Sequence, residues 1–250
     1  MIELINIKKR YGELNAVDGI DLKVNPGEIY GFLGPNGAGK TTTIRMITGI
    51  LPATSGDIII DSYNLKSDPM ICKRITGYVP DRPFVYEKLR AWEFLQFICD
   101  LYSLNRKTVL QDAEELLEMF QLSHAKYRLI EDFSHGMKQK LVIISSLLSD
   151  PKLLVIDEPM VGLDPKGATI LKALFRKLAS AGKTIFLSTH TMSVAEELCD
   201  RISIIHAGKI KASGSMSELR NLGKGDGNLE QIFLKITEEE VLSDAAHSLS

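Results

Sequence analysis

The sequence predicts an α/β fold built on a largely parallel β-sheet with helices between its strands. Three features support this prediction. A loop with three glycines, at residues 34–41, separates a short apolar strand at 28–33 from a helical segment at 42–50. A second apolar strand at 153–157 runs into two carboxylates, and a third lies at 184–188. Short apolar runs of this kind are typical of parallel strands that are buried on both faces.

The glycine-rich loop has the sequence Gly-Pro-Asn-Gly-Ala-Gly-Lys-Thr, which matches the pattern G-x-x-x-x-G-K-[ST] at every fixed position. Its backbone N–H groups can face one anion, and the following helix adds partial positive charge at its N-terminus. Lys40 would reach the outer phosphates, and the Thr41 hydroxyl would bind magnesium. A chance glycine-rich turn is the alternative, but strand and helix stand where the pattern needs them. We therefore predict nucleoside triphosphate binding by Gly34, Asn36, Gly37, Ala38, Gly39, Lys40, Thr41 and Thr42.

The composition excludes several classes of protein. At 250 residues the chain can form one large α/β domain or two small ones. Its net charge of −2 gives no reason to expect nucleic-acid binding. Apolar runs such as residues 141–148 are far shorter than the roughly 18 residues that cross a bilayer, and the charged N-terminus does not resemble a signal peptide. The cysteines, Cys72, Cys99 and Cys199, form no C-x-x-C pair, so we expect reduced thiols in a cytosolic protein.

The N-terminal segments show the alternation of half-buried strands. Residues 2–7 and 20–24 are predicted as antiparallel strands with one solvated face, and residues 57–60 return to a strand. Tyr11 is expected in a turn between the first two strands. Its ring could stack on an adenine, or it could be an ordinary turn tyrosine, and this segment alone does not decide between the two.

A helical insert follows a short strand that ends at residues 77–81. Apolar residues recur at helical spacing between residues 86 and 148, and the acidic residues at 112–118 are expected on a solvated helix face. We therefore predict a helical insert at about residues 84–150, between the glycine-rich loop and the next strand of the core.

The strand at residues 153–157 carries the second group of candidate site residues. Its apolar residues run into Asp157 and Glu158, at the end of the strand where parallel sheets place their ligands. Two adjacent carboxylates there are costly unless a cation or a reacting water uses them. Asp157 fits a magnesium-side aspartate, and Glu158 could act as general base. The alternative is a pair that merely caps a turn, which the upstream phosphate loop disfavours.

The remaining chain continues the same alternation. A loop at residues 159–165 precedes a helix at 166–181, which Gly182 closes. The strand at 184–188 ends close to His190, which by itself would more often be structural. A second helix and a hairpin at 202–206 and 209–213 follow. A flexible linker is predicted at 223–228, and a short amphipathic helix at 229–237.

The order of these motifs resembles the nucleotide-binding subunit of ABC transporters along nearly all of residues 2–213. The resemblance implies a P-loop NTPase of the ABC-ATPase fold, with a RecA-like core, an antiparallel β subdomain and an inserted α-helical subdomain. It implies a domain at residues 1–220, followed by the linker and helical tail at 221–250. The segment Phe-Ser-His-Gly-Met at 133–137 resembles the family signature Leu-Ser-Gly-Gly-Gln. The cofactors implied are ATP and Mg²⁺.

The resemblance also assigns roles to single residues. Tyr11 resembles the aromatic residue that stacks on adenine, with Val17 beside the nucleotide, and Gly162-Leu163-Asp164 resembles the family's D-loop. His190 resembles the switch histidine and would act in catalysis with Glu158. Ser134 would cap a helix whose free N–H groups face an anion, together with Gly136. In the family the signature of one subunit closes on the ATP of another, so a second, identical or related ATPase subunit is expected.

Two positions depart from the family pattern. Asp81 stands where the family usually has glutamine; its carboxylate can bind magnesium, but it is shorter and charged. In the signature, His135 replaces a glycine and Met137 a glutamine, whereas Ser134 and Gly136 are retained. The form Ser-x-Gly-Met-Lys-Gln at residues 134–139 resembles the drug- and multidrug-exporter branch of the family, as do residues 229–237.

We therefore predict an ATP-hydrolysing subunit that dimerises around two MgATP molecules and powers a separately encoded transmembrane permease, an exporter, at the cytoplasmic face of the membrane. The permease would dock in a groove near Asp81 and the helical insert. The alternative is a soluble ABC-type ATPase of translation or DNA repair. Such relatives carry two domains in one chain or long coiled coils in the insert, and neither is found here. A GTP switch would need an N-K-x-D motif, which the sequence lacks.

Overall fold

The computed structural model describes residues 1–222 and 229–234. In this part of the chain, a six-stranded sheet has the strand order β10-β9-β3-β8-β7-β6, and neighbouring strands are parallel except β9 and β10. Its strands are β3 (Ile29–Leu33), β6 (Thr76–Val79), β7 (Leu153–Asp157), β8 (Thr184–Thr189), β9 (Arg201–His206) and β10 (Lys209–Gly214). The predicted parallel sheet is therefore present, with one antiparallel strand at its edge.

The centre of this sheet is buried on both faces. Every residue of β3, β7 and β8 is buried, which explains their apolar sequences. The register pairs Leu33 with Thr189 and Asp157 with Ser188, so the carboxyl ends of the three strands meet at one edge. This edge places the phosphate loop beside the two carboxylates that follow β7.

A second, antiparallel sheet has four strands among the described residues, in the order β2-β1-β4-β5. Its strands are β1 (Ile2–Tyr11), β2 (Leu14–Val24), β4 (Ser55–Ile60) and β5 (Tyr63–Asn64). Strands β1 and β2 extend further than the alternating pattern predicts, because irregularities in their register break the alternation after Leu4 and Ile7. The predicted turn position of Tyr11 is wrong: Tyr11 ends β1 and pairs with Leu14.

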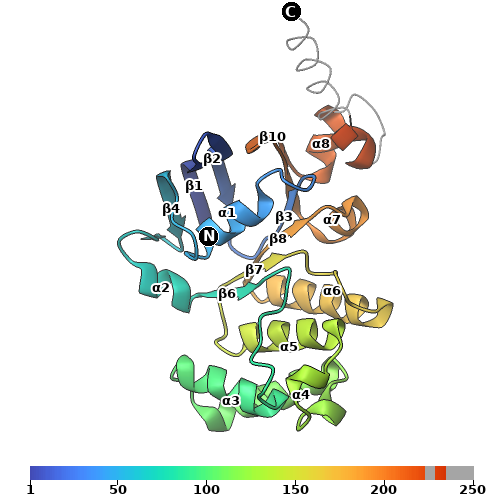
Figure 1. Ribbon diagram of the computed structural model, residues 1–250. Coiled ribbons are helices and arrows are strands. Elements are labelled where there is room, and N and C mark those ends of the chain that lie inside the picture. Colours follow the sequence, from blue (N-terminus) through green and yellow to red (C-terminus); the bar gives the residue numbers. More distant parts are fainter. Residues whose placement is uncertain (223–228, 235–250) are drawn as a thin grey trace, which may run out of the picture.

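Helix α1 (Lys40–Ile47) lies between the two sheets (Figure 1) and contacts β2, β7 and β8. It begins two residues before the predicted start, so that Lys40 and Thr41 belong to its first turn. Beyond Thr48 the chain turns at Gly49, which has φ +67°. The first turn of α1 lies at the carboxyl edge of the large sheet, where Thr41 hydrogen-bonds to Asp157 at the end of β7, as the phosphate-loop pattern requires.

The predicted helical insert lies between β6 and β7. Its elements are α3 (Ala91–Leu101), α4 (Arg106–Met119), two short 3-10 helices, η1 (Ser123–Ala125) and η2 (Ile130–Asp132), and α5 (His135–Leu147). Leu95, Leu117, Phe120 and Ile144 are buried where these helices pack together. Figure 1 shows them on the side of the large sheet away from the antiparallel sheet. A short helix, α2 (Pro69–Arg74), was not foreseen.

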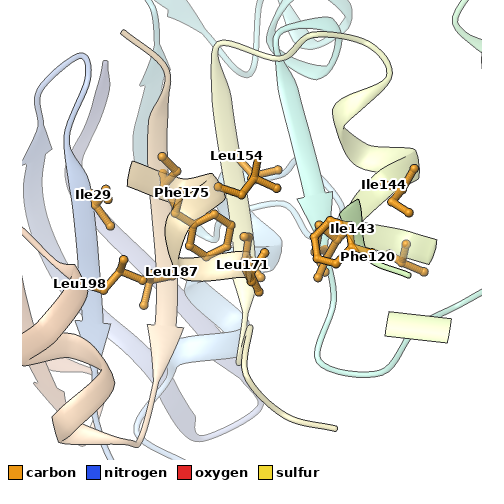
Figure 2. Close-up of a cluster of buried hydrophobic side chains, with 14 of the residues drawn as sticks. Ile29, Phe120, Ile143, Ile144, Leu154, Leu171, Phe175, Leu187 and Leu198 are labelled. Carbon is orange, nitrogen blue, oxygen red and sulfur yellow. The ribbon is translucent and has the colours of Figure 1, made fainter. Parts of the chain in front are cut away.

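Helix α6 (Pro165–Ser180) covers one face of the large sheet. Its Leu171 and Phe175 lie beside Leu154 and Leu187 of β7 and β8 (Figure 2), and all four side chains are almost completely buried. The same core continues to the buried residues of the helical insert. A single apolar core thus joins the strands that carry the site to the helices of the insert.

In the C-terminal part, α7 (Met192–Leu198) packs on strands β3 and β8 of the large sheet and α8 (Met216–Leu222) packs on β10. Residues 229–234 are helical. The buried Leu229 and Ile232 join the core near α7. The predicted linker at 223–228 and the end of the predicted tail helix lie outside the described residues. Among the helices that the structure describes, none is long and apolar enough to span a bilayer.

Candidate nucleotide-binding and hydrolysis site

The glycine-rich loop packs so closely against neighbouring backbone that two of its glycines have no room for a side chain. A Cβ atom on Gly34 would lie 2.4 Å from the carbonyl oxygen of Ile205, and one on Gly39 would lie 2.6 Å from that of Ala16. Gly39 also has φ +109°, a conformation that favours glycine. The loop is thereby held between β9 and the antiparallel sheet, directly before the N-terminus of α1.

The Lys40 side chain lies across this loop and is only 7% exposed. Its Nζ donates hydrogen bonds to the carbonyl oxygens of Gly34, at 2.7 Å, and Pro35, at 3.2 Å. The same nitrogen is 3.9 Å from Oε1 of Glu158. Burial lowers the pKa of Lys40, while the carboxylates of Glu158 and Asp157 oppose this change. The loop therefore presents a partly desolvated ammonium, which attracts anions more strongly than an exposed one.

Asp157 is only 1% exposed, and both of its carboxylate oxygens accept hydrogen bonds. Thr41 Oγ1 donates to Oδ2 at 2.8 Å, and the Ser188 hydroxyl donates to Oδ1. Burial raises the pKa of Asp157, although these two hydrogen bonds lower it in part; the negative charges of Asp81 and Glu158 raise it further. A buried carboxylate that is destabilised in this way gains from a nearby cation.

Glu158 follows β7 in the left-handed backbone region, with φ +53°. Its backbone N–H donates to the carbonyl oxygen of Ser188 at 3.2 Å. Its Oε1 is 2.8 Å from Nδ1 of His190, which lies just beyond β8. Because a non-glycine residue in this region costs free energy, the surrounding contacts must hold it there. The backbone of Glu158 is therefore fixed, and its side chain is paired with His190, which directly follows the neighbouring strand β8.

Lys40, Thr41, Asp157 and Glu158 line one pocket of about 220 Å³. Its walls come from β2, the loop, the first turn of α1, the segment that follows β6, and the end of β7 with the residue after it: Ala16, Pro35, Asn36, Gly37, Gly39, Lys40, Thr41, Thr42, Asp81, Asp157 and Glu158. Most of the predicted site residues are therefore brought together. Gly34 and Ala38 support the loop from behind, and Ala38 is buried.

Two residues predicted to contact the nucleotide, Val17 and Tyr11, are not part of the pocket lining. Val17 is completely buried in the core, and its neighbour Ala16 lines the pocket instead. Tyr11 is 49% exposed at the end of β1, with Nζ of Lys9 5.3 Å from the centre of its ring. Tyr11 is thus available on the surface, but it does not line the described pocket.

The signature residues form a separate group at the N-terminus of α5. Ser134 caps this helix: its Oγ accepts a 3.3 Å hydrogen bond from the backbone N–H of Met137. Asp164 occupies the N-cap position of α6 without a side-chain capping bond, and its Oδ1 is 2.9 Å from Nζ of Lys140. Ser134, Gly136 and Asp164 are absent from the described lining of the nucleotide pocket. One chain therefore holds two groups of predicted phosphate-binding residues at different places.

The sequence did not point to three residues of the site. Ser188 bonds Asp157, and Ala16 and Pro35 line the pocket. Ser188 could have been found as a hydroxyl near the end of an apolar strand that pairs with β7. Ala16 lies in β2, outside the glycine-rich loop, and no sequence pattern singles it out.

Comparison with known proteins agrees with this geometry. The model of the ABC transporter family matches residues 17–161. The linearmycin resistance ATP-binding protein LnrL of Bacillus subtilis (strain 168) is 38% identical over 226 residues, which cover 90% of this chain and 73% of LnrL. A solved ATP-binding subunit of an ABC transporter is 33% identical with a TM-score of 0.90, covering 95% of this chain and 99% of that one. A dimeric ATP-binding cassette bound to ADP and Pi after hydrolysis is 25% identical, with a TM-score of 0.79 and coverage of 86% and 98%.

The chain belongs to the ABC transporter family. It is an ATP-binding subunit with ATPase activity that powers a transporter. The predicted ABC-ATPase fold is confirmed, including its core sheet, antiparallel subdomain and helical insert. The soluble alternative in translation or DNA repair is not favoured.

Proposed function

We propose that this chain hydrolyses MgATP as one half of a dimer, and that this dimer powers a membrane permease that exports its substrate. The observation that supports this most strongly is the meeting of Lys40, Thr41, Asp157, Glu158 and His190 at one sheet edge. We assign the ATPase domain to residues 1–220, with the helical insert at about 84–150, and a linker and tail to 221–250.

ATP would lie with its phosphates along the glycine-rich loop and the first turn of α1. The loop's backbone N–H groups and the helix N-terminus supply positive potential, and Lys40 adds a full charge. Thr42, Asn36 and Gly37 line the same pocket and would contact the phosphates. Tyr11 would stack on the adenine from the end of β1, and Val17 would support this side of the nucleotide from the core.

A magnesium ion would be held by oxygen groups of the same pocket, beside the phosphates. Thr41 and Asp157 already share a hydrogen bond, and Asp81 lines the same pocket. Within the described residues no cluster of three or more histidine, cysteine or acidic side chains could enclose a metal. Mg²⁺ is usually held by one or two carboxylates, water and substrate phosphates, and the pocket offers Asp157, Asp81 and the Thr41 hydroxyl for this. Bound there, Mg²⁺ would neutralise charge on the phosphates.

Glu158 would act as general base on the attacking water. Its Oε1 lies between Nδ1 of His190, at 2.8 Å, and Nζ of Lys40, at 3.9 Å, so two neighbours orient the carboxylate. A positioned base accepts the proton as the water attacks the terminal phosphate. Lys40 would stabilise the charge that develops on that phosphate.

A second subunit would complete each site. Ser134 and Gly136 stand at a helix N-terminus that suits phosphate but does not line this chain's own pocket. A two-fold dimer in which each α5 N-terminus and Asp164 face the partner's ATP would use both groups. Two ATP molecules would then be buried in a self-complementary interface.

The permease would dock in a groove of about 610 Å³ beside the helical insert. The groove runs from the end of β6 to α3 and α5, close to Asp81 in the chain. Several of its large apolar side chains are exposed, including Phe84 at 79%, Leu101 at 65% and Tyr86 at 52%. The Tyr86 ring packs edge-on against Phe84 and Phe97. Exposed apolar surface of this extent is typical of an interaction site.

Two further features support export from the cytoplasmic side. One similar protein is named for linearmycin resistance, and the signature segment resembles the exporter branch. Nothing in the charge pattern suggests a nucleic-acid partner, so we expect the permease and a second ATPase subunit as partners.

This proposal is tested by purifying the tagged protein from its native membranes in mild detergent. We expect a polytopic membrane protein at stoichiometric ratio, identified by mass spectrometry. Recovery of soluble partners or ribosomes alone would contradict the transport role while leaving the ATPase chemistry intact.

A further inference from the structure

The N-terminal turn of α5 presses directly on the loop that follows Glu158. A Cβ atom on Gly162 would lie only 2.2 Å from Cδ2 of His135 and 2.9 Å from its Nε2. The imidazole therefore occupies the space that a side chain at residue 162 would need. His135 is the residue that replaces a glycine of the family signature, so this contact exists because of that departure.

Two further contacts strengthen this junction. A Cβ atom on Gly136 would lie 2.4 Å from the carbonyl oxygen of Gly162, so backbone meets backbone there. One turn further along α5, Nζ of Lys140 is 2.9 Å from Oδ1 of Asp164. The hydrogen bond from Lys140 lowers the pKa of Asp164, which keeps this carboxylate ionised.

The loop between Glu158 and Asp164 is short and internally bonded. The N–H of Val161 donates to the carbonyl oxygen of Glu158 at 3.2 Å, and the N–H of Leu163 donates to that of Met160 at 3.3 Å. Gly162 is only four residues from Glu158, whose φ of +53° must be held by its surroundings. A shift of Gly162 would therefore reach the backbone of Glu158.

We infer that His135 is a positioning residue: its ring fixes the loop at Gly162 and so sets the placement of Glu158. The inference rests on the proposed role of Glu158 as general base. It assigns to the altered signature residue a task within its own subunit, in addition to the phosphate contacts proposed for Ser134 and Gly136 toward the partner.

The test adds a methyl group where His135 leaves no room for one. Gly162→Ala forces the ring to move, whereas Gly182→Ala adds the same methyl at φ +84° with no atom within 4 Å. The second variant thus controls for backbone strain alone.

We expect Gly162→Ala to lower kcat for ATP about tenfold or more, because small displacements of reacting groups are costly. The KM for ATP should change less than about twofold, since Glu158 is assigned to chemistry rather than binding. Gly182→Ala should stay close to wild type.

Removing the ring should relieve the collision. In the double variant His135→Ala with Gly162→Ala, we expect kcat about threefold or more above Gly162→Ala alone, because contacting residues are energetically coupled. Binding of a fluorescent ATP analogue and thermal melting, measured on all four proteins, show that site and fold are kept.

The inference is overturned if the double variant turns over no faster than Gly162→Ala, or if Gly182→Ala is equally impaired. It is also overturned if the change appears in KM rather than in kcat. A wild-type turnover that survives Glu158→Gln would instead contradict the proposed base, and this separates the two failures.

Discussion

The Thr41 hydroxyl donates a 2.8 Å hydrogen bond to Oδ2 of Asp157, although 116 positions separate the two residues in the chain. This contact joins the first turn of α1 to the end of β7. It brings the phosphate loop and the carboxylates into one site.

Glu158→Gln should reduce ATP turnover by about 10²–10⁴-fold, because glutamine cannot accept the proton from water. The change keeps the size of the side chain, so binding of a fluorescent ATP analogue should be nearly unaffected. Steady-state ATPase assays and size-exclusion chromatography with ATP measure turnover and dimer formation. Turnover within severalfold of wild type would exclude Glu158 as the base.

Asp157→Asn should make the nucleotide-free protein more stable while lowering turnover by about 10²-fold or more. Burial raises the pKa of Asp157 above 3.8 in the folded state, so the ionised carboxylate opposes folding at neutral pH. Below pH 3.8 the group is protonated in both folded and unfolded protein, and the penalty disappears. The gain in melting temperature should therefore be largest near pH 7 and shrink as the pH approaches 4.

Asp18→Asn provides a control of opposite sign. Lys209 and Lys8 lower the pKa of this carboxyl, so its charge favours folding above 3.8. The variant should gain no stability at pH 7. An equal rise in melting temperature for both variants would show that loss of net negative charge, rather than burial, explains the effect of Asp157→Asn.

The three cysteines should resist thiol reagents in the native protein. Burial raises the pKa of Cys72, Cys99 and Cys199, so little thiolate forms near pH 8, and all three side chains are buried. With Ellman's reagent we expect almost no reaction until guanidinium is added, when three thiols per chain should react. Rapid reaction of even one thiol in the native protein would contradict this burial.

Phe84→Asp should prevent recovery of the membrane partner without lowering the ATPase activity of the isolated subunit. Phe84 is 79% exposed in the groove and has no place in the nucleotide pocket. Tyr127→Asp is a matched control, because Tyr127 is 62% exposed but lies outside the groove. Co-purification from native membranes measures the effect. Equal recovery with both variants would exclude the groove as the docking surface.

Much of the fold could be predicted because its strands are short apolar runs between strong turns. The predicted strand at 153–157 has the observed bounds of β7. Predictions failed where tertiary contacts set the bounds: β1 reaches Tyr11 through register irregularities that no alternating pattern reveals. Helix α2 was missed because it has only six residues, although Pro69 at its start is a typical first helical residue.

The site could be predicted where residues of fixed chemistry occur at fixed spacing. Lys40, Thr41, Asp157 and Glu158 have such spacing, and the structure places them in one pocket. The contact of His135 with Gly162 could not be foreseen, since it depends on how α5 meets a loop 27 positions later. The hydrogen bond from Ser188 to Asp157 likewise depends on the pairing of β7 with β8.

The two carbonyl hydrogen bonds of Lys40 also have an entropic consequence. A free lysine side chain loses up to about 2 kcal/mol of rotamer freedom when it becomes fixed. Here the carbonyl groups of Gly34 and Pro35 fix the Lys40 ammonium when the protein folds. Much of the side-chain entropy is therefore lost on folding rather than on phosphate binding. Arginine at residue 40 would keep the charge, but its planar head group cannot reproduce this arrangement. The restriction of one side chain in the folded subunit thus contributes to its affinity for nucleotide.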